Sequence, residues 1–223
     1  MDFMKWLGSF DELLYEVMSW LLFFPLTLWR ATVEPIRVMD EIEREAALPD
    51  EQQYAAVLSP PLFLALALLL GHAVATALGQ TDQIVANRHG LADLVDDNAS
   101  ALALRVVVFA AFPLFLAARL VRCRGVRLDR TSLRSPFYAQ CYPAAVFALG
   151  VSLGTSLALD DHQLARSIGH WLVALSVVNF WLVETRWFAR SLRIGYLRAT
   201  GNVLLGLLEG SLFLLGVGFL FTR

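Results

Sequence analysis

The chain has few charged residues, only two cysteines and no common phosphate-binding or metal-binding motif. Charged residues make up 17% of the chain and hydrophobic residues 57%, whereas ordinary soluble domains carry more charge and fewer apolar side chains. Cys123 and Cys141 do not form a Cys-x-x-Cys pair, which argues against a zinc or dithiol redox site. A phosphate-binding loop and a His-Glu-x-x-His pair are missing. We therefore expect a protein that is not an enzyme and uses no metal ion or cofactor.

Long apolar runs dominate the last three quarters of the chain. Nineteen helical residues cover roughly 28 Å, close to the ~30 Å hydrocarbon layer of a bilayer. The runs are continuous and do not alternate, which favours helices over the strands of a barrel. We predict an all-α polytopic membrane protein with a segment 1–58 and a transmembrane domain 59–223. The five predicted spans are 60–79, 100–120, 137–159, 168–188 and 203–221.

The first segment has the pattern of an amphipathic helix. Over residues 2–24, apolar side chains recur at three- and four-residue steps, and most acids fall away from that stripe. Pro25 is expected to end or kink this helix near Phe24. We predict that the helix lies in the inner interface, with a full span over 13–29 as the alternative. Short water-facing helices are expected from Pro35 and from Pro49.

Arginine content alternates between the loops and predicts the orientation. The loops 119–135 and 184–202 hold ten arginines together, whereas the loop 80–99 and the turn 160–167 hold one arginine each. Arginine-rich loops stay in the cytoplasm. The predicted topology therefore has its N-terminus inside and its C-terminus outside. Because this topology accounts for the basic clusters, no nucleic-acid partner is expected.

Polar residues inside the spans are candidates for a solute or proton pathway. Glu209 and Asn179 both fall in the inner half of the membrane, where we expect them to meet with Tyr142 nearby. His72 falls in the outer half at the level of Arg105. Intramembrane ionisable residues are costly and mark pathways. The alternatives are a structural buried acid at Glu209 and an Arg105 side chain that reaches the headgroups.

Two further patterns concern lipid and packing. Six arginines in one predicted cytosolic loop are candidate ligands for anionic lipid headgroups, although topology alone also explains them. These are Arg119, Arg122, Arg124, Arg127, Arg130 and Arg134. Two Gly-x-x-x-Gly pairs predict close helix packing, either within one chain or between subunits. They are Gly150 with Gly154 and Gly206 with Gly210. A five-helix bundle this small is expected to form a homo-oligomer.

The runs SWLLFFPLTLWR, which ends at Arg30, and LSPPLFLALALLLGH, which ends at His72, carry a family resemblance. With five spans after an amphipathic N-terminal region, the chain resembles bacterial permease-like proteins and, distantly, the Yip-domain family of five-span membrane proteins. That resemblance implies a five-helix bundle in a bacterial inner (cytoplasmic) membrane, in a group linked to membrane trafficking or transport. It implies no catalytic residue.

Two functions from different classes follow as expectations. The first is a small oligomeric transporter or channel for an ion, a proton or a small molecule, whose pathway contains Glu209, Asn179, His72 and Tyr142. The second is a non-transporting scaffold that binds lipid or a cytosolic protein partner through residues 1–58. Membrane lipids are partners in both.

Overall fold

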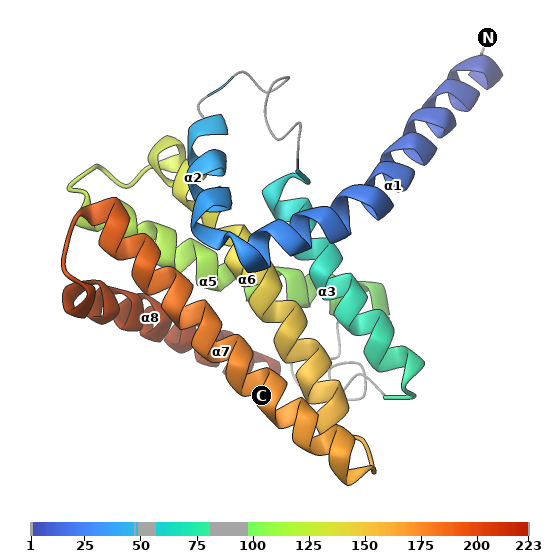
Figure 1. Cartoon of the computed structure of the whole chain (residues 1–223). Coiled ribbons are helices and arrows are strands. Elements are labelled where there is room, and N and C mark those ends of the chain that lie inside the picture. The colour runs from blue at the N-terminus through green and yellow to red at the C-terminus, as the bar shows by residue number, and fades with distance from the viewer. Residues whose placement is uncertain (1, 47, 49–56, 81–97, 223) are drawn as a thin grey trace.

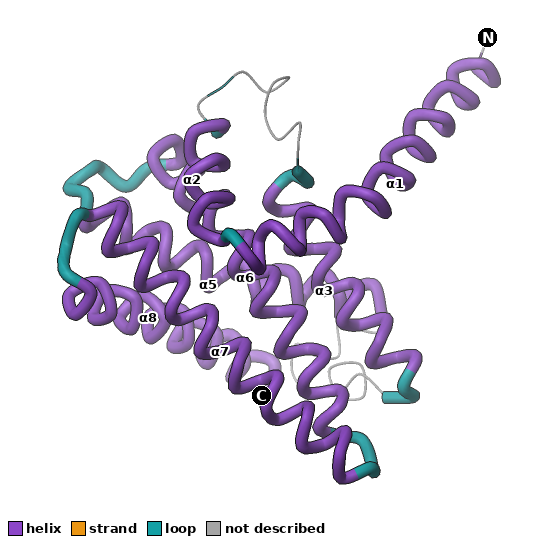
Figure 2. Tube along the Cα trace, in the orientation of Figure 1, coloured by secondary structure: helices purple, strands orange, loops and turns teal. Residues whose placement is uncertain are grey.

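The computed structural model describes residues 2–46, 48, 57–80 and 98–222, and within these ranges it contains seven helices and no strand (Figures 1 and 2). The helices are α1 (Asp2–Val33), α2 (Pro35–Glu45), α3 (Pro60–Ala77), α5 (Asn98–Cys123), α6 (Arg130–Ala158), α7 (Gln163–Leu192) and α8 (Tyr196–Thr222). Five of them, α3 and α5 to α8, are long and apolar enough to cross a bilayer. The prediction of an all-α protein with five candidate spans is confirmed.

The helices of the bundle are longer than the apolar runs that predict them. α6 begins at Arg130, seven residues before the predicted span, and α7 continues to Leu192. The extra turns carry arginines. A hydropathy pattern leaves arginine out of a predicted span, but arginine has a high helix propensity, so the helix continues through these residues. α5 and α7 end and α6 and α8 begin on the same side of the bundle. We call this side the arginine-bearing end.

A capping box starts α6. The Asp129 carboxylate accepts hydrogen bonds from the backbone N–H groups of Thr131 at 3.0 Å and Ser132 at 2.8 Å. The Ser132 hydroxyl in turn accepts the Asp129 N–H at 3.0 Å. These bonds, led by the one from Ser132, lower the pKa of Asp129 below its ordinary value of 3.8. The helix then continues through Pro136 and Pro143 without ending.

α6 is the central helix of the bundle, and it packs against α2, α3, α5 and α7. Small residues line its buried faces, including Ala139, Ala144, Ala145 and Ala148, so the neighbouring backbones can approach closely. α7 folds back along α6, and a methyl group added at Gly169 would lie 2.5 Å from the Gly154 carbonyl oxygen. α8 lies along α5, with Gly206 against Leu116. Both predicted glycine pairs therefore face helices of the same chain.

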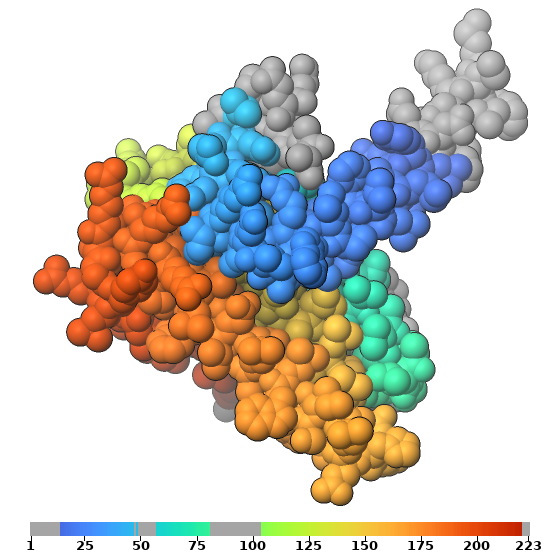
Figure 3. All heavy atoms as spheres, in the orientation of Figure 1, coloured from blue at the N-terminus to red at the C-terminus, as the bar shows by residue number. Residues whose placement is uncertain are grey.

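α1 differs from its prediction at Pro25. The helix runs unbroken from Asp2 to Val33, so it does not end near Phe24, and the alternative of a kink there stays a prediction. The missing N–H of a proline costs one hydrogen bond, and packing on α3 and α6 accompanies the turns around it. Figures 1 and 3 show α1 extending away from the bundle. It is not among the five helices that meet the length and hydropathy of a span.

Of the part of the first segment that is expected to face water, residues 30–46, 48, 57 and 58 are described. α2 starts at Pro35 as predicted, and its buried side chains are Val38, Met39 and Ile42. The second short helix, expected from Pro49, lies almost wholly outside the described residues. The same holds for most of the loop 80–99.

Gly169→Ala will destabilise the α6–α7 hairpin, because the new methyl group has no room against the Gly154 carbonyl. Overpacking of this kind costs about 1–3 kcal/mol, and a lower thermal midpoint in detergent will report it. Gly216→Ala is the matched control, since nothing lies within 4 Å of a methyl group there. Equal midpoints for the two variants would contradict the close packing.

The Asp129 cap predicts a pH dependence. Because its pKa is lowered by folding, the ionised cap stabilises α6 above the unfolded pKa. That contribution is lost as the pH falls through the folded pKa. Thermal midpoints should be compared between pH 7 and about pH 3 for the wild type, Asp129→Ala and Asp129→Asn. At low pH the thermal midpoint of the wild type should approach that of the Asp129→Ala variant. Asparagine caps a helix without titrating, so the midpoint of the Asp129→Asn variant should stay above that of the alanine variant at both pH values. If the thermal midpoints of the wild type and of Asp129→Ala differed by the same amount at both pH values, the prediction would be refuted.

Candidate functional site

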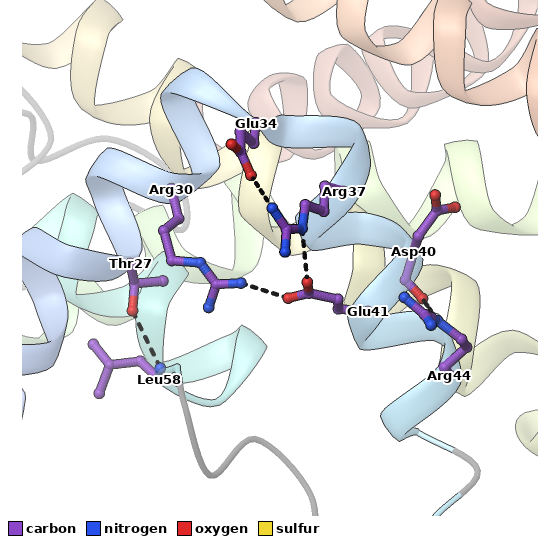
Figure 4. Close-up of polar contacts among 8 residues, drawn as sticks. All are labelled: Thr27, Arg30, Glu34, Arg37, Asp40, Glu41, Arg44 and Leu58. Atoms are coloured by element: carbon purple, nitrogen blue, oxygen red, sulfur yellow. Dashed lines mark hydrogen bonds and ion pairs between the residues drawn. The ribbon is translucent and has the colours of Figure 1, made fainter.

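α2 is fastened over the arginine-bearing end of the bundle. Its apolar face is buried against α6 and α7, and its acids bind arginines of α1, of α7 and of the turn that follows α5. The ion pairs are Asp40–Arg190 at 2.7 Å, Glu43–Arg124 at 2.7 Å and Arg30–Glu41 at 2.5 Å. Figure 4 shows Arg30 reaching from the end of α1 across to Glu41, which Arg37 also contacts. The acidic side chains of α2 are therefore partnered within the chain.

Tyr142, one of the predicted pathway residues, holds the start of α3. Its hydroxyl donates to the Leu58 carbonyl oxygen at 2.5 Å, and its ring stacks on Phe63 at 5.3 Å. The Leu58 N–H donates to the buried Thr27 hydroxyl at 3.3 Å (Figure 4). Both backbone groups of Leu58 are thus bound by side chains from α1 and α6, so this contact joins three segments of the chain.

Glu209 binds arginines of α5, and the expected contact with Asn179 is not formed in the described structure. Its carboxylate pairs with Arg119 at 3.1 Å and with Arg122 at 3.5 Å. Arg119 also donates to the Asn202 side-chain oxygen at 3.2 Å. Side chains lean toward the N-terminus of their helix, so Arg119 and Glu209 on antiparallel helices lean toward each other. Asn179 is half-buried on α7, and His72 lies on α3.

A different set of polar side chains is buried without partners. Gln140 on α6 and Glu184, Thr185 and Trp187 on α7 are all buried. Among the described residues, no hydrogen bond reaches the Gln140 amide, either Glu184 carboxylate oxygen, the Thr185 hydroxyl or the Trp187 indole N–H. Buried polar groups are nearly always hydrogen-bonded. We call these four residues the buried polar cluster.

The pairing of α6 with α7 places the four residues at two neighbouring levels of the bundle. The rings of Phe147 and Phe180 stack at 4.8 Å, and the glycine contacts nearer the turn keep the same antiparallel pairing. One helical turn from the Phe147–Phe180 contact toward the arginine-bearing end, Pro143 on α6 is level with Glu184 on α7. One turn beyond that, Gln140 on α6 is level with Trp187 on α7. Pro143 has no N–H to donate, so the Ala139 carbonyl on α6 lacks its usual helical partner close to this level.

The cluster lies just beneath α2. Arg190, which binds Asp40, is less than two turns beyond Glu184 on α7. The Ser135 hydroxyl on α6 donates to the Glu43 carbonyl oxygen at 3.1 Å, between one and two turns beyond Gln140. The ion-paired helix α2 therefore contacts α6 and α7 within two turns of the buried polar cluster.

The remaining chemical patterns support no second centre in the described part of the chain. No three His, Cys, Asp or Glu side chains there lie close enough to hold a metal ion. Residues 150–154 read Gly-x-Ser-x-Gly, but they lie inside α6. A nucleophile elbow needs a turn from strand to helix, so Ser152 is not placed as one.

Sequence reasoning identified Glu209 as the notable acid and placed Glu184 at the inner end of the fourth predicted span without selecting it as a site residue. Glu184 stands two residues before Arg186, so it falls both in the predicted span 168–188 and in the arginine-rich loop 184–202. A signal was present: Phe180, Glu184 and Phe188 are spaced by four residues, which puts the acid on the apolar face of a helix. All three are buried.

The five helices that are long and apolar enough to cross a bilayer indicate a multi-pass α-helical membrane protein. No protein-family model, curated protein or solved structure matches it. The resemblance to the Yip-domain family stays a prediction that rests on the two short apolar runs and the five-span layout.

Tyr142→Phe will lower stability, because the buried Leu58 carbonyl loses its side-chain donor. Leaving a buried acceptor unsatisfied costs about 1–3 kcal/mol. Thermal unfolding in detergent measures this loss, with Tyr196→Phe as the control because Tyr196 is 67% exposed. A loss no larger than that of the control would show that the hydroxyl does not hold the start of α3.

Proposed function

We propose that the chain is a small transporter or channel for protons or small cations, and that the buried polar cluster is its intramembrane binding site. The observation that carries the proposal is Glu184, whose two carboxylate oxygens are buried in an apolar bundle with no partner among the described residues. Ionisable groups inside a membrane domain are costly and are characteristic of ion pathways and proton relays.

Glu184 must be neutralised, because an isolated buried carboxylate charge is very unfavourable. No described arginine or histidine pairs with it, so its charge is removed either by a proton or by a bound cation. A carrier of protons or small cations alternates between these two states. The Gln140 amide oxygen, the Thr185 hydroxyl and the Ala139 carbonyl freed by Pro143 are hard oxygen ligands of the kind that alkali cations accept.

In this proposal, access to the site from the arginine-bearing end requires movement of α2, which packs on α6 and α7 at that end. Its three ion pairs are partly exposed, and exposed ion pairs contribute little energy each. α2 can therefore serve as a gate that opens without unfolding the bundle. Toward the opposite end, the close contact between α6 and α7 at Gly154 and Gly169 keeps the cluster closed.

The proposal includes the predicted orientation, with the arginine-bearing end and α2 in the cytoplasm of a bacterium and the chain in its inner membrane. The charge distribution supports this, since ten arginines lie in the two predicted loops, 119–135 and 184–202, at that end. A homo-oligomer remains part of the proposal because one small bundle leaves little room for a pathway. Glu209 joins α5 to α8 here, while Asn179 and His72 stay candidates for the route.

One observation favours the alternative function, a scaffold that binds lipid or a cytosolic partner. α1 extends from the bundle (Figure 1) and exposes large apolar side chains. They include Leu14, Met18, Leu21, Leu22 and Trp29. A helix with such a face lies on a membrane surface or against another protein.

Flux into liposomes tests the proposed function. Purified protein should dissipate a proton, sodium or potassium gradient faster than empty liposomes do. Glu184→Gln should abolish that flux because glutamine keeps the size and polarity but cannot exchange a proton or a charge. Glu16→Gln, at an exposed position of α1, is the matched control and should leave the flux unchanged. Flux of the Glu184→Gln variant at the wild-type level would remove Glu184 from the mechanism. If wild type and empty liposomes are alike for all three ions, the scaffold function is favoured.

A further inference from the structure

We infer that the cation that exchanges with a proton at Glu184 is a lipophilic organic monocation, whose apolar body occupies a pocket beside the buried polar cluster. The inference rests on the proposed function, because it takes Glu184 as the exchanging group, and it names the substrate class. The pocket has a volume of about 360 Å³, and we call it the aromatic pocket. Its lining consists of Phe112 on α5, Phe147 on α6, Val177, Phe180 and Trp181 on α7, and Leu204, Leu207 and Ser211 on α8.

Aromatic rings from three helices form much of the pocket wall. Phe147 stacks on Phe180 with ring centres 4.8 Å apart, and Phe112 meets Phe147 edge to face at 6.4 Å. The faces of such rings attract cations, and quaternary ammonium ions are recognised in this way. Ser211 carries the only side-chain oxygen in this lining, whereas an inorganic cation needs several oxygens to replace its hydration shell. The wall therefore suits an organic cation.

Glu184 lies beside the pocket. It follows Phe180 by one turn of α7, about 6 Å along the axis, and its side chain leans toward the start of the helix and hence toward Phe180. Glu184 is eight residues before the end of α7, and Leu204 is eight residues after the start of α8, so the acid is level with a residue of the lining. Charges attract strongly across such a distance in a medium of low dielectric constant. A cation in the pocket can thus neutralise the unpartnered carboxylate.

The pocket opens sideways between α7 and α8. Val177, Trp181 and Leu204 are each at least 37% exposed, and they belong to helices that are long and apolar enough to cross a bilayer. Hydrocarbon is therefore expected at the mouth of the pocket. A ligand that enters from there must dissolve in lipid, which favours a cation with a large apolar body over a hydrated inorganic ion.

Other ionisable groups around Glu184 are engaged or less acidic. Ion pairs hold the charged side chains of the neighbouring helices toward the arginine-bearing end, and these pairs are Arg190–Asp40, Arg124–Glu43, Arg119–Glu209 and Arg122–Glu209. On α7, Arg186 is exposed. On α6, the Tyr142 hydroxyl donates to Leu58, and Cys141 is a buried thiol. Carboxyl groups are far more acidic than thiols, so Glu184 is the group that gives up its proton.

The exchange balances charge. When the cation enters, the O–H bond of the Glu184 carboxyl breaks and the proton passes to water. When the cation leaves, a proton from water returns to the carboxylate. The site is neutral in both states, as burial in an apolar bundle requires.

Equilibrium dialysis of methyltriphenylphosphonium against protein in phosphatidylcholine nanodiscs, corrected for empty nanodiscs, tests the inference. Triphenylphosphine oxide is the neutral comparison compound, because it has the same rings and no net charge. The cation should bind more tightly than the oxide, and in unbuffered solution each cation bound should release one proton. Glu184→Gln should lower the affinity for the cation by roughly a hundredfold and abolish proton release, but leave binding of the oxide unchanged.

A pair of tryptophan variants tests the pocket itself. Trp181→Leu should weaken binding of the cation by roughly fivefold, because one ring of the wall is lost. Trp171→Leu is the matched control, since Trp171 is also an exposed tryptophan of α7 but lies outside the pocket lining. Its affinity should equal that of the wild type. Thermal midpoints close to that of the wild type will show that both variants are folded.

Four results would overturn the inference: no binding above empty nanodiscs, equal affinity for the cation and the oxide, an unchanged affinity in Glu184→Gln, or equal losses in the two tryptophan variants. Equal affinity for the two compounds would mean that the pocket takes a neutral apolar group such as an acyl chain. The proposed function fails in a different measurement, the flux of inorganic ions into liposomes. Dialysis needs no flux, so the two failures are distinguishable.

Discussion

The close approach of α6 and α7 is the interaction on which the other contacts depend. In lipid the hydrophobic effect does not drive helices together, so contact comes from packing and polar bonds. Gly154 and Gly169 let the two backbones touch, which fixes the antiparallel pairing of the hairpin. That pairing brings Gln140 and Glu184 to neighbouring levels, and it gives α2 a continuous surface on which to dock.

The sequence predicted the number, type and approximate ends of the spans, because hydropathy over a 20-residue window measures the transfer of a whole helix into lipid. It did not predict the partners of single side chains. Glu209 was expected beside Asn179 but pairs with Arg119, since a depth along the membrane normal does not specify which helices are neighbours. Glu184 was placed at the inner end of the fourth span but was not selected as a site residue, because nearby arginines lower the local hydropathy, although its helix face is apolar.

Charges that are far apart in the sequence meet in the fold. The acids of residues 1–58 outnumber the bases there, and the arginines follow later in the chain. In the structure, Asp40 and Glu43 reach Arg190 and Arg124. Arginines whose loop position is explained by topology thus also hold a helix against the bundle. The near-neutral net charge of −2 conceals this arrangement.

The double anchoring of Leu58 has a consequence for biosynthesis. Its carbonyl partner, Tyr142, lies 84 residues later in the chain, so the ribosome has produced α3 and α5 before that bond can form. Until α6 enters the bilayer, α1 and the beginning of α3 lack the helix on which they rest. The amino-terminal segment is therefore held in its final place late in synthesis, although it is translated first.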